Sequence, residues 1–396
     1  AGRDGRTDPQ RLREPGAGEG DGACAPDLVY GGFPCFAAGT MVLTADGFRP
    51  IEVVAVGDLV LTHHGRWRAV TSIMRRQAHA TARVRGHGIP DICTTAEHPF
   101  WGRRTRQHWL RRRTDGTRPT ERAWTSPEWT SASSMAGRYA AQVLPSQPPV
   151  PIPEPFAGGG STDPDTFWWV VGRYLADGWV TKSGGKWRVV ICASHDDDGA
   201  REHIRCWFPT SSVCRERTVT KYHITLGGFA RWLAPFGRYA HGKTLPGWIY
   251  CLPDRYAAAL LNGYLSGDGN QTTAYWRCTT VSRALALGVA LLAQRVYGVV
   301  ASVHRSDVPA WTTIEGRTVH QRPHYSVVIP RRNRSGRVEG QYGWKYVRSV
   351  KPDIGTEVFN LSVAEDESYV ADGCVVHNCQ DLSMAGKRVG LGGDRS

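Results

Sequence analysis

Cysteine, histidine and asparagine residues near the two ends of the chain have the side chains that acyl-transfer chemistry requires. Cys35 stands near the start, and His377, Asn378 and Cys379 follow one another near the end of the 396 residues. The ten cysteines show no CxxC spacing and no regular framework, and we see no signal peptide. We therefore expect a cytoplasmic protein whose thiols stay reduced and free to act as nucleophiles.

Two segments in the middle of the chain repeat one pattern, in which small residues four positions apart precede Asp-Gly. The segments are Val170-Val171-Gly172-Arg173-Tyr174-Leu175-Ala176-Asp177-Gly178 and Leu260-Leu261-Asn262-Gly263-Tyr264-Leu265-Ser266-Gly267-Asp268-Gly269. Small residues four apart share one face of a helix, so two such helices can approach closely. The glycine after each aspartate permits the chain to turn away.

Pairing these two helices would place Asp177 and Asp268 next to each other at one end. Two converging carboxylates bind divalent magnesium well. A metal beside a phosphodiester can activate water and stabilise the leaving oxygen. The pattern therefore predicts a Mg²⁺ site that consists of these two residues.

The charge of the chain favours a polyanionic partner. The formal net charge is +13 and the sequence pI is about 9.4. Arginines recur along the chain, at Arg103, Arg104, Arg106, Arg111 to Arg113, Arg331, Arg332 and Arg334. Such spread suits the phosphates of double-stranded DNA. The alternative is an ordinary solvated basic surface.

Short apolar-polar alternations at both ends flank a different middle. Residues 40–75 read as short antiparallel strands, including Ile51-Glu52-Val53-Val54, with turns at Gly47, Gly57 and Gly65. Residues 356–376 return to short strands, whereas residues 145–166 are a Pro- and Gly-rich linker and helices follow from about 167. No run reaches the roughly 18 apolar residues of a membrane span, so we expect no membrane partner.

The flanks of this arrangement fit together. Joining Pro34 to Cys379 gives Gly-Phe-Pro-Cys-Gln within PDLVYGGFPCQDLSMAGKRVGLGGDRS. This joined sequence resembles the catalytic loop of DNA cytosine-5 methyltransferases. The resemblance implies that, in the joined host, the thiolate of Cys379 attacks cytosine and the methyl group comes from S-adenosylmethionine.

The intervening segment, residues 35–378, resembles inteins, whose splicing domain is related to the hedgehog autoprocessing domain. The resemblance rests on four features: an initial Cys35, an internal Thr95-x-x-His98, a terminal His377-Asn378, and a following cysteine. It implies that Cys35 attacks the Pro34 carbonyl with help from Thr95 and His98. It also implies that the following thiol accepts the acyl group and that Asn378 cyclises with help from His377, without any cofactor.

This chain departs from the usual intein pattern in two places, and a third feature affects the rate. Many inteins have an aspartate where Asn360 stands, and an amide can hydrogen-bond but cannot titrate as an acid. A histidine that often precedes the last strands is missing from Glu365-Asp366-Glu367-Ser368-Tyr369. Pro34 beside the scissile bond restricts its carbonyl, so we expect a slow first step.

The paired Asp-Gly segments resemble the LAGLIDADG motifs of homing endonucleases. That resemblance implies two half-domains whose saddle-shaped sheets lie on DNA, with Asp177 and Asp268 as catalytic metal ligands. Lys243, in Lys243-Thr244-Leu245-Pro246, matches a further family segment and is expected near the metal. Residues 101–140 are either an extra DNA-contacting arm or a decorated pair of strands, and we favour the strands.

The sequence thus predicts a multidomain protein in which an all-β intein-like splicing domain is interrupted by an α+β LAGLIDADG endonuclease. The expected parts are a host flank 1–34, splicing domain 35–150, linker 151–166, endonuclease 167–340, splicing domain 341–378 and host flank 379–396. We expect a monomer that splices itself and cuts double-stranded DNA at the homing site in the intein-free methyltransferase gene. The alternative is an intein that only splices and carries an inactive DNA-binding insert. Methyltransferase activity of this chain itself is rejected, since no Gly-rich S-adenosylmethionine-binding loop precedes Pro34.

Overall fold

The computed structural model describes residues 33–109, 114, 120–158, 160–161, 163–314, 316–333 and 336–378. The predictions for Cys379, for both host flanks up to residue 32 and from residue 379, and for Arg111 to Arg113 therefore lie outside the described residues. Strands dominate the described part, with some helices.

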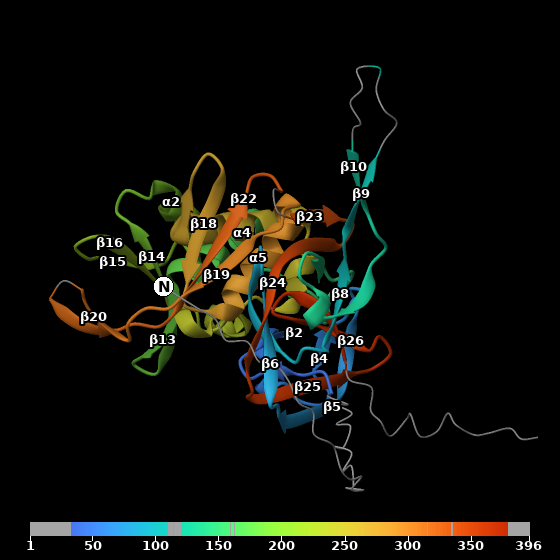
Figure 1. The fold of residues 1–396 in the computed structure, drawn as a ribbon. Helices are drawn as coiled ribbons and strands as arrows, with labels where there is room; N and C mark the ends of the chain where they lie inside the picture. The colour runs from blue at the N-terminus through green and yellow to red at the C-terminus, as the bar shows by residue number, and fades with distance from the viewer. Residues whose placement is uncertain are drawn as a thin grey trace, which may run out of the picture. The chain divides into compact units, whose positions relative to one another are not determined.

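Within the described residues, 15 strands form one sheet, in the order β11-β8-β12-β24-β6-β7-β1-β25-β5-β4-β2-β26-β27, with β23 beside β24 and β3 beside β2. Strands from the start and the end of the chain alternate in it, so that blue and red ribbons lie side by side in Figure 1. β24 lies between β12 and β6, and β25 lies between β1 and β5. Because β27 also pairs with β8, the path of strands closes on itself. The bounds are β1 (Phe36–Ala37), β2 (Met41–Thr44), β3 (Gly47–Pro50), β4 (Leu59–Leu61), β5 (Trp67–Gln77), β6 (Ala80–Gly86), β7 (Ile89–Thr94), β8 (Pro99–Arg103), β11 (Glu128–Ser131), β12 (Tyr139–Val143), β23 (Gly336–Glu339), β24 (Tyr342–Ile354), β25 (Glu357–Val363), β26 (Ser368–Ala371) and β27 (Cys374–His377).

The turns of this sheet occur where glycines predicted them. Gly47, Gly57 and Gly65 have φ values of 105°, 94° and 72°, a left-handed conformation that favours glycine. One prediction here is wrong, because the segment that begins at Ile51 is the short 3₁₀ helix η1 (Ile51–Val53) and not a strand. Pro50 ends β3 there, and a single turn buries Ile51 and leaves Val53 half exposed.

The middle of the chain repeats one topology twice. In each copy a helix leads into two strands, a second helix and two more strands, and the strands order as first-second-fourth-third: β13-β14-β16-β15 and β17-β18-β22-β19. The first copy contains α1 (Pro164–Asp177), β13 (Gly178–Ser183), β14 (Lys186–Ser194), α2 (Asp198–Trp207), β15 (Ser212–Arg215), β16 (Val219–Ile224) and α3 (Gly227–Trp232). The second contains α4 (Asp254–Asp268), β17 (Gly269–Gln271), β18 (Tyr275–Thr280), α5 (Arg283–Tyr297), β19 (Ser302–Ser306) and β22 (His324–Pro330). Short 3₁₀ helices lie between the copies, η3 (Ala234–Phe236), η4 (Ala240–Gly242) and η5 (Gly247–Cys251).

The leading helices α1 and α4 pack at backbone distance. A Cβ atom on Gly172 would lie 2.0 Å from the Leu260 carbonyl oxygen, and one on Gly263 would lie 2.0 Å from the Trp169 carbonyl oxygen. No larger residue fits at either position, as the spacing of small residues predicts. Helix α1 begins at Pro164. The side chain of the preceding Asp163 caps it by accepting hydrogen bonds from the backbone N–H groups of Asp165 and Thr166.

The glycines that end these helices have a different role from the predicted one. Gly178 and Gly269 have φ values of −117° and −90°, which is extended backbone and not a left-handed cap. A Cβ atom would lie 2.5 Å from the Tyr174 ring at Gly178, and 2.2 Å from the Leu265 carbonyl oxygen at Gly269. Glycine is required here because the next strand leaves the helix at close range.

Buried apolar residues form two main clusters. One fills the large sheet and includes Phe36, Phe100 and Leu361. The other joins α1, α4 and α5 to their sheets and reaches Leu43 and Trp344 of the large sheet. The middle of the chain thus shares a core with the strands around it.

Residues 101–140 agree with the strand interpretation. β8 and β11 pair in the large sheet, and β9 (Thr105–Trp109) and β10 (Thr120–Trp124) form a two-stranded hairpin between them. The 3₁₀ helix η2 (Ala132–Ser134) follows, and a second isolated hairpin consists of β20 (Trp311–Ile314) and β21 (Arg317–His320). In the part of the chain that the structure covers, no helix is long and apolar enough to cross a membrane.

Candidate functional site

The peptide bond between Pro34 and Cys35 lies in a buried, hydrogen-bonded setting. The Cys35 backbone N–H donates to Thr95 Oγ1 at 3.1 Å, and the Thr95 backbone N–H donates back to the Cys35 carbonyl oxygen at 2.9 Å. The Thr94 hydroxyl donates to the same oxygen at 2.8 Å. Cys35 itself is fully buried. These bonds arise because β1 pairs with β7, whose last residue is Thr94.

Asn360 points its amide N–H at the carbonyl of the preceding residue. Its Nδ2 donates to the Pro34 carbonyl oxygen at 2.5 Å. The direction of the amide is fixed, because the Leu361 backbone N–H and the Tyr369 hydroxyl both donate to Oδ1 at 2.8 Å. A held donor at this oxygen is what stabilises the negative charge of a tetrahedral intermediate. Tyr369 was missed by the sequence analysis, and nothing in the sequence pattern distinguishes it from a core tyrosine.

His98 lies next to this peptide as a neutral imidazole. It is fully buried, with its ring centroid 4.1 Å from that of Phe36. Burial, helped by His377, lowers its pKa to about 3, although the backbone of Pro34 and of His377 acts weakly in the other direction. No described group completes a well-directed hydrogen bond with either ring nitrogen. The ring can therefore exchange a proton with a reacting group without first breaking a strong bond.

The other end of the excisable segment is held by the last strands. The Asn378 backbone N–H donates to the Glu367 carbonyl oxygen at 2.8 Å, and a His377 Nδ1 contact of 2.9 Å reaches the Asn378 carbonyl oxygen. With its amide turned to suit its neighbours, Asn378 donates through Nδ2 to Glu367 O at 2.9 Å, and Oδ1 accepts from Val363 N at 3.1 Å. Nδ2 then lies 3.3 Å from His377 Nδ1, which accepts from it only in the tautomer that does not donate to the Asn378 carbonyl oxygen. His377 Nδ1 thus lies near both the side chain and the carbonyl oxygen of Asn378.

His63 is a further histidine at this end that the sequence analysis missed. It lies in the turn between β4 and β5, and its Nδ1 is 2.7 Å from Ser368 Oγ. Trp129 contacts both histidines, with centroid distances of 5.5 Å to His63 and 4.9 Å to His377. Burial, followed by the nearby His64, lowers the His63 pKa to about 4. His63 and its partner Ser368 are 305 positions apart in the sequence, so a local sequence pattern could not have identified His63 as part of this site.

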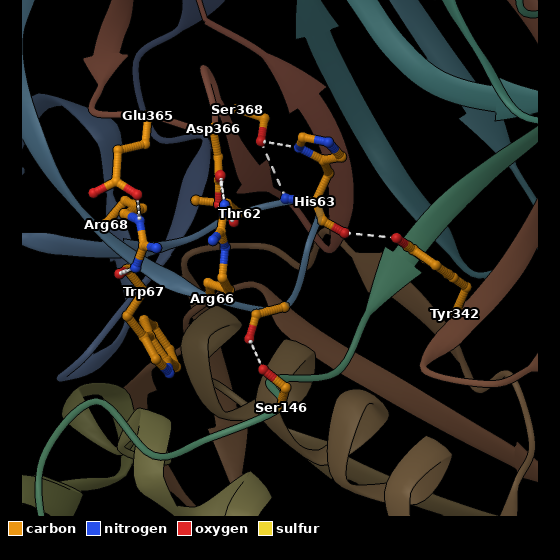
Figure 2. A network of polar contacts seen from close by, with 11 residues as sticks. Thr62, His63, Arg66, Trp67, Arg68, Ser146, Tyr342, Glu365, Asp366 and Ser368 are labelled. Carbon is orange, nitrogen blue, oxygen red and sulfur yellow. Dashed lines mark hydrogen bonds and ion pairs between the residues drawn. The ribbon is translucent and has the colours of Figure 1, made fainter.

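Figure 2 shows how His63 is held in place. The Ser368 hydroxyl contacts both its backbone N and its ring, and the Tyr342 hydroxyl donates to its carbonyl oxygen at 2.8 Å. From the turn between β25 and β26, Asp366 accepts from Thr62 at 2.5 Å and forms an ion pair with Arg66. His63 thus occupies the vicinity of Ser368, which lies in the segment where the expected histidine is missing.

In the middle of the chain, Asp177 and Asp268 converge at the ends of α1 and α4. Burial is the main reason that both carboxyl pKa values rise, that of Asp268 to about 6. The charge of Asp177 raises the pKa of Asp268 further, whereas the like charge that acts on Asp177 is that of Asp197. The ends of the two helices are also close in space, since a Cβ atom on Gly267, the residue before Asp268, would lie 2.7 Å from Asp177 Oδ2. Two partly buried carboxylates that repel each other fit a divalent cation.

Lys243 lies at the same place and also has a structural role. Its Nζ donates to the carbonyl oxygens of Tyr174 and Leu175, at 2.6 and 2.8 Å, and so satisfies the last turn of α1. Burial lowers its pKa to about 8, against the effects of Asp268 and Asp177. The structure therefore brings together all three residues that the resemblance pointed to.

Arg173 is a residue of this site that the sequence analysis missed. Its guanidinium is buried and forms ion pairs with Asp177 at 3.2 Å and with Asp197 at 3.0 Å. An arginine inside an otherwise apolar helix stripe, four residues before the aspartate, was the signal that could have identified it. No group of three or more His, Cys, Asp or Glu side chains suited to a metal occurs in the described ranges. Water and phosphate oxygens would therefore have to complete a magnesium shell on Asp177 and Asp268.

One family model matches a segment near the start of the described residues. Residues 34–95 match the family model of the Hint domain, the intein-like domain. The chain is 27% identical over 370 residues to an iron-sulfur cluster assembly SufBD family protein of Mycobacterium tuberculosis, covering 87% of this chain and 43% of that protein. It is 26% identical over 425 residues to the ATP-dependent DNA helicase Hel308 of Thermococcus kodakarensis, covering 90% and 37%. The chain thus spans less than half the length of the curated relatives that it matches.

Two solved structures show distant similarity to the chain. The homing endonuclease I-DmoI in complex with its target DNA aligns with a TM-score of 0.32 and 16% identity, covering 42% of this chain and 89% of that one. The bacterial intein-like domain from Clostridium thermocellum aligns with a TM-score of 0.16 and 21% identity, covering 25% and 79%.

Proposed function

We propose that this chain is an intein that excises residues 35–378 and joins Pro34 to Cys379, and that its insert is a DNA-cutting homing endonuclease. One observation carries the splicing assignment: the Pro34 carbonyl oxygen receives the oriented amide of Asn360, beside the buried Cys35 thiol and the neutral ring of His98. The match of residues 34–95 to the Hint domain supports it.

The first step follows from the geometry at Pro34. The Cys35 sulfur attacks the Pro34 carbonyl carbon, and the developing oxyanion takes its hydrogen bond from Asn360. The C–N bond then breaks, and the thiol proton passes by way of His98 to the departing Cys35 amine, which leaves a thioester. Thr95 accepts from that same backbone nitrogen and so orients it.

The later steps use the other end. The Cys379 thiolate takes the acyl group from Cys35, and the Asn378 side-chain nitrogen attacks its own carbonyl carbon. A succinimide forms and the Cys379 amine leaves, with His377 in contact with the reacting carbonyl. A final sulfur-to-nitrogen shift restores a peptide between Pro34 and Cys379. These steps need no cofactor.

The two curated relatives support an inserted element. Their names describe an iron-sulfur cluster assembly protein and a DNA helicase, yet each matches most of this chain over less than half of its own length. A segment shared by proteins with such different names is what a mobile insertion would produce.

The nuclease assignment rests on Asp177 and Asp268, which would hold Mg²⁺ between the paired helices. The bound ion would supply Lewis acidity and a lowered pKa of its water. Lys243 keeps the end of α1 in place and puts a cation beside both carboxylates. Double-stranded DNA of the intein-free host gene is the proposed substrate, and the active unit is a monomer because one chain contains both motifs.

We assign the host as a DNA cytosine-5 methyltransferase, on the joined Gly-Phe-Pro-Cys-Gln sequence alone. S-adenosylmethionine would be needed only by the spliced host. Cys379 would then act twice, first as the acceptor in splicing and later as the nucleophile toward cytosine.

A splicing-only protein remains the second candidate, and one observation favours it. The Arg173–Asp177 ion pair places a cation on one of the two proposed metal ligands, where it competes with magnesium. The methyltransferase host would be unaffected by this alternative.

Both assignments can be tested on the whole chain. Expressed wild-type protein should yield a ligated product and free residues 35–378, and Cys35→Ala or Asn378→Ala should abolish both. An unprocessed wild type would refute splicing. With Mg²⁺, the chain should cut a duplex that spans the uninterrupted Gly-Phe-Pro-Cys-Gln codons, and cutting should vanish in Asp177→Asn. Cutting by wild type that survives this change would move the nuclease site elsewhere, and no cutting at all would favour the splicing-only candidate.

A further inference from the structure

A basic cleft lies where the large sheet meets the second copy of the repeated topology. It has a volume of about 680 Å³ and is lined by β6, β7 and β24 on one side and by β19 and β22 on the other. Its cationic lining residues are Arg83, Arg85, Arg283, Arg305, Arg348 and Lys351. The carboxylates among its described lining are Asp91 and Asp307, so positive charge predominates.

Two of the six lining cations have no described ion pair. Four others do: Arg83 with Asp353, Arg85 with Asp91, Arg283 with Asp372 and Arg305 with Asp307. Lys351 is exposed, and no ion pair to it occurs within the described ranges. Arg348, also exposed, has a single described hydrogen-bond contact, to His87 at 3.2 Å. These two side chains on β24 can therefore bind an anion without breaking an internal ion pair.

Burial and, after it, the positive charge of the cleft lower the pKa values of two histidines that line it. Burial lowers the pKa of His87, and Arg348 lowers it further. The pKa of His304 is lowered first by burial and then by Arg277 and Arg348. Both rings are therefore neutral near pH 7, although they line a cleft that is otherwise cationic.

The cleft meets a polar sheet face at His304. In β22 the alternate residues Val327 and Ile329 are buried against the helices, so Ser326 and its partners face the other way. Those partners are Thr279 of β18 and His304 of β19. His304 also lines the cleft, and β19 is the edge strand of this sheet, so a ligand on the polar face reaches the cleft across this edge.

We propose that double-stranded DNA bound on the second sheet continues over β19 onto β6 and β24, where Arg348 and Lys351 bind its phosphates. The inference rests on the proposed nuclease function and deepens it, because it assigns part of the DNA site to strands of the splicing module. Contacts of this kind fix position and add affinity, but they do not read sequence.

The spacing of the two cations is compatible with successive phosphates of a polymer. Arg348 and Lys351 lie at most roughly 10 Å apart along β24, so their side chains can extend to different phosphates. Successive phosphates of a nucleic acid backbone can each meet one of them. Double-stranded DNA is the polymer that the neighbouring sheet face and the paired aspartates require.

The test uses the full chain with Cys35→Ala, Asn378→Ala and Asp177→Asn, which neither splices nor cuts. Affinity for the duplex with the uninterrupted host codons is measured between 0.05 and about 0.3 M salt. Removing two phosphate contacts through Arg348→Ala with Lys351→Ala should weaken binding about 30-fold near 0.15 M salt, and should reduce the log–log salt slope by about 1.8. Shortening the duplex on the cleft side should remove this difference.

The matched control removes two exposed cations from the helix layer, Arg205→Ala with Arg255→Ala, and should change affinity and slope far less. The cleft variant should also splice at the wild-type rate when Cys35 and Asn378 are restored. Equal effects of the two double variants would overturn the inference while leaving the proposed function standing. If the parent chain binds no duplex, the proposed nuclease function fails and the inference fails with it.

Discussion

Asn360 presents an N–H group to the Pro34 carbonyl oxygen at 2.5 Å. An ionised acid in its place would put negative charge against that oxygen at neutral pH. The orientation depends on Tyr369, which holds the amide oxygen. In the proposed mechanism, the departure from the usual intein pattern is therefore a change of electrostatic role, from proton donor to hydrogen-bond donor.

We predict that Asn360→Ala slows thioester formation between Pro34 and Cys35 by about 10²–10³-fold, the usual cost of an oxyanion donor. Tyr369→Phe, which only frees the amide to rotate, should have a smaller effect of about 10-fold or less. Thiol-induced cleavage at Pro34 in an Asn378→Ala background measures this step alone. An unaltered cleavage rate in Asn360→Ala would show that the contact has no catalytic role.

The buried histidine predicts how stability depends on pH. The folded pKa of His98 is about 3, below the ordinary 6.5, so the unfolded chain binds a proton first as the pH falls. The free energy of unfolding contributed by this residue is complete above about pH 6.5 and is lost progressively toward pH 3. Denaturant unfolding of a splicing-blocked Cys35→Ala, Asn378→Ala chain between pH 7 and pH 4 should show this loss.

The control for the pH experiment is His98→Gln in the same blocked chain. Its free energy of unfolding should depend less steeply on pH, by up to about 1.4 kcal/mol per pH unit. The slope is compared and not the absolute value, since the substitution changes packing as well. Parallel pH curves for the two proteins would mean that His98 is protonated in the folded state.

At the scale of elements, sequence pattern was most informative where spacing alone controls packing. The four-residue spacing of small side chains identified the α1–α4 contact, and glycines identified the turns at Gly47, Gly57 and Gly65. The sequence pattern gave the wrong conformation for Gly178 and Gly269. A glycine at the end of a helix can adopt a left-handed turn or can allow close backbone approach, and which of the two occurs depends on the next strand. Only the folded structure shows where that strand goes.

Candidate site residues divide in the same way. Cys35, Thr95 and His98 come from motifs, and the structure brings them to one peptide, although their catalytic roles stay predictions. His63 and Arg173 were missed, because their importance arises from contacts with residues distant in sequence or from burial of a charge. No local pattern encodes such contacts.

We predict that Gly172→Ala and Gly263→Ala each destabilise the helix pair by about 1–3 kcal/mol, since the new Cβ would meet backbone at 2.0 Å. Gly199→Ala in α2 is the matched control, with its nearest contact at 3.8 Å. That change should be neutral or slightly stabilising. Thermal unfolding together with DNA cleavage measures both effects, and a stable, fully active Gly172→Ala protein would contradict the close packing.

On the scale of the whole molecule, the insert and the splicing strands share charged as well as apolar contacts. Arg283, at the start of α5, forms an ion pair of 2.8 Å with Asp372, a fully buried residue in the turn between β26 and β27. Burial raises the pKa of Asp372 even with this partner in place. Six residues further along the chain lies Asn378, which cyclises in the proposed mechanism.

We predict that replacing residues 164–330 by a short Gly-Ser linker impairs release at Asn378, because the Asp372 carboxylate then lies buried without Arg283. Leaving one member of a buried ion pair alone costs about 3–5 kcal/mol. Asp372→Asn should therefore improve splicing of the shortened chain. In the full chain the same change should destabilise the fold, because Arg283 loses its partner.

Because Asp372→Asn should act in opposite directions in the shortened and the full chain, each chain serves as the control for the other. Splicing yield and unfolding temperature are measured in both. Asp372 has φ of 48°, a conformation that asparagine also adopts readily, so backbone strain should not confuse the comparison. An equal effect of Asp372→Asn in both chains would show that the ion pair does not couple the two parts.

The alternation of early and late strands in the large sheet has a consequence during synthesis on the ribosome. The amide that meets the Pro34 carbonyl belongs to β25, which inserts between β1 and β5. A nascent chain that has emerged only as far as residue 330 already contains Cys35 and both aspartates, but it lacks the strand that completes the first reaction centre. If the proposed splicing takes place, bond rearrangement must wait until almost all of residues 35–378 have left the ribosome. By then the insert is fully made, so each ligated product would be accompanied by one complete copy of the proposed nuclease.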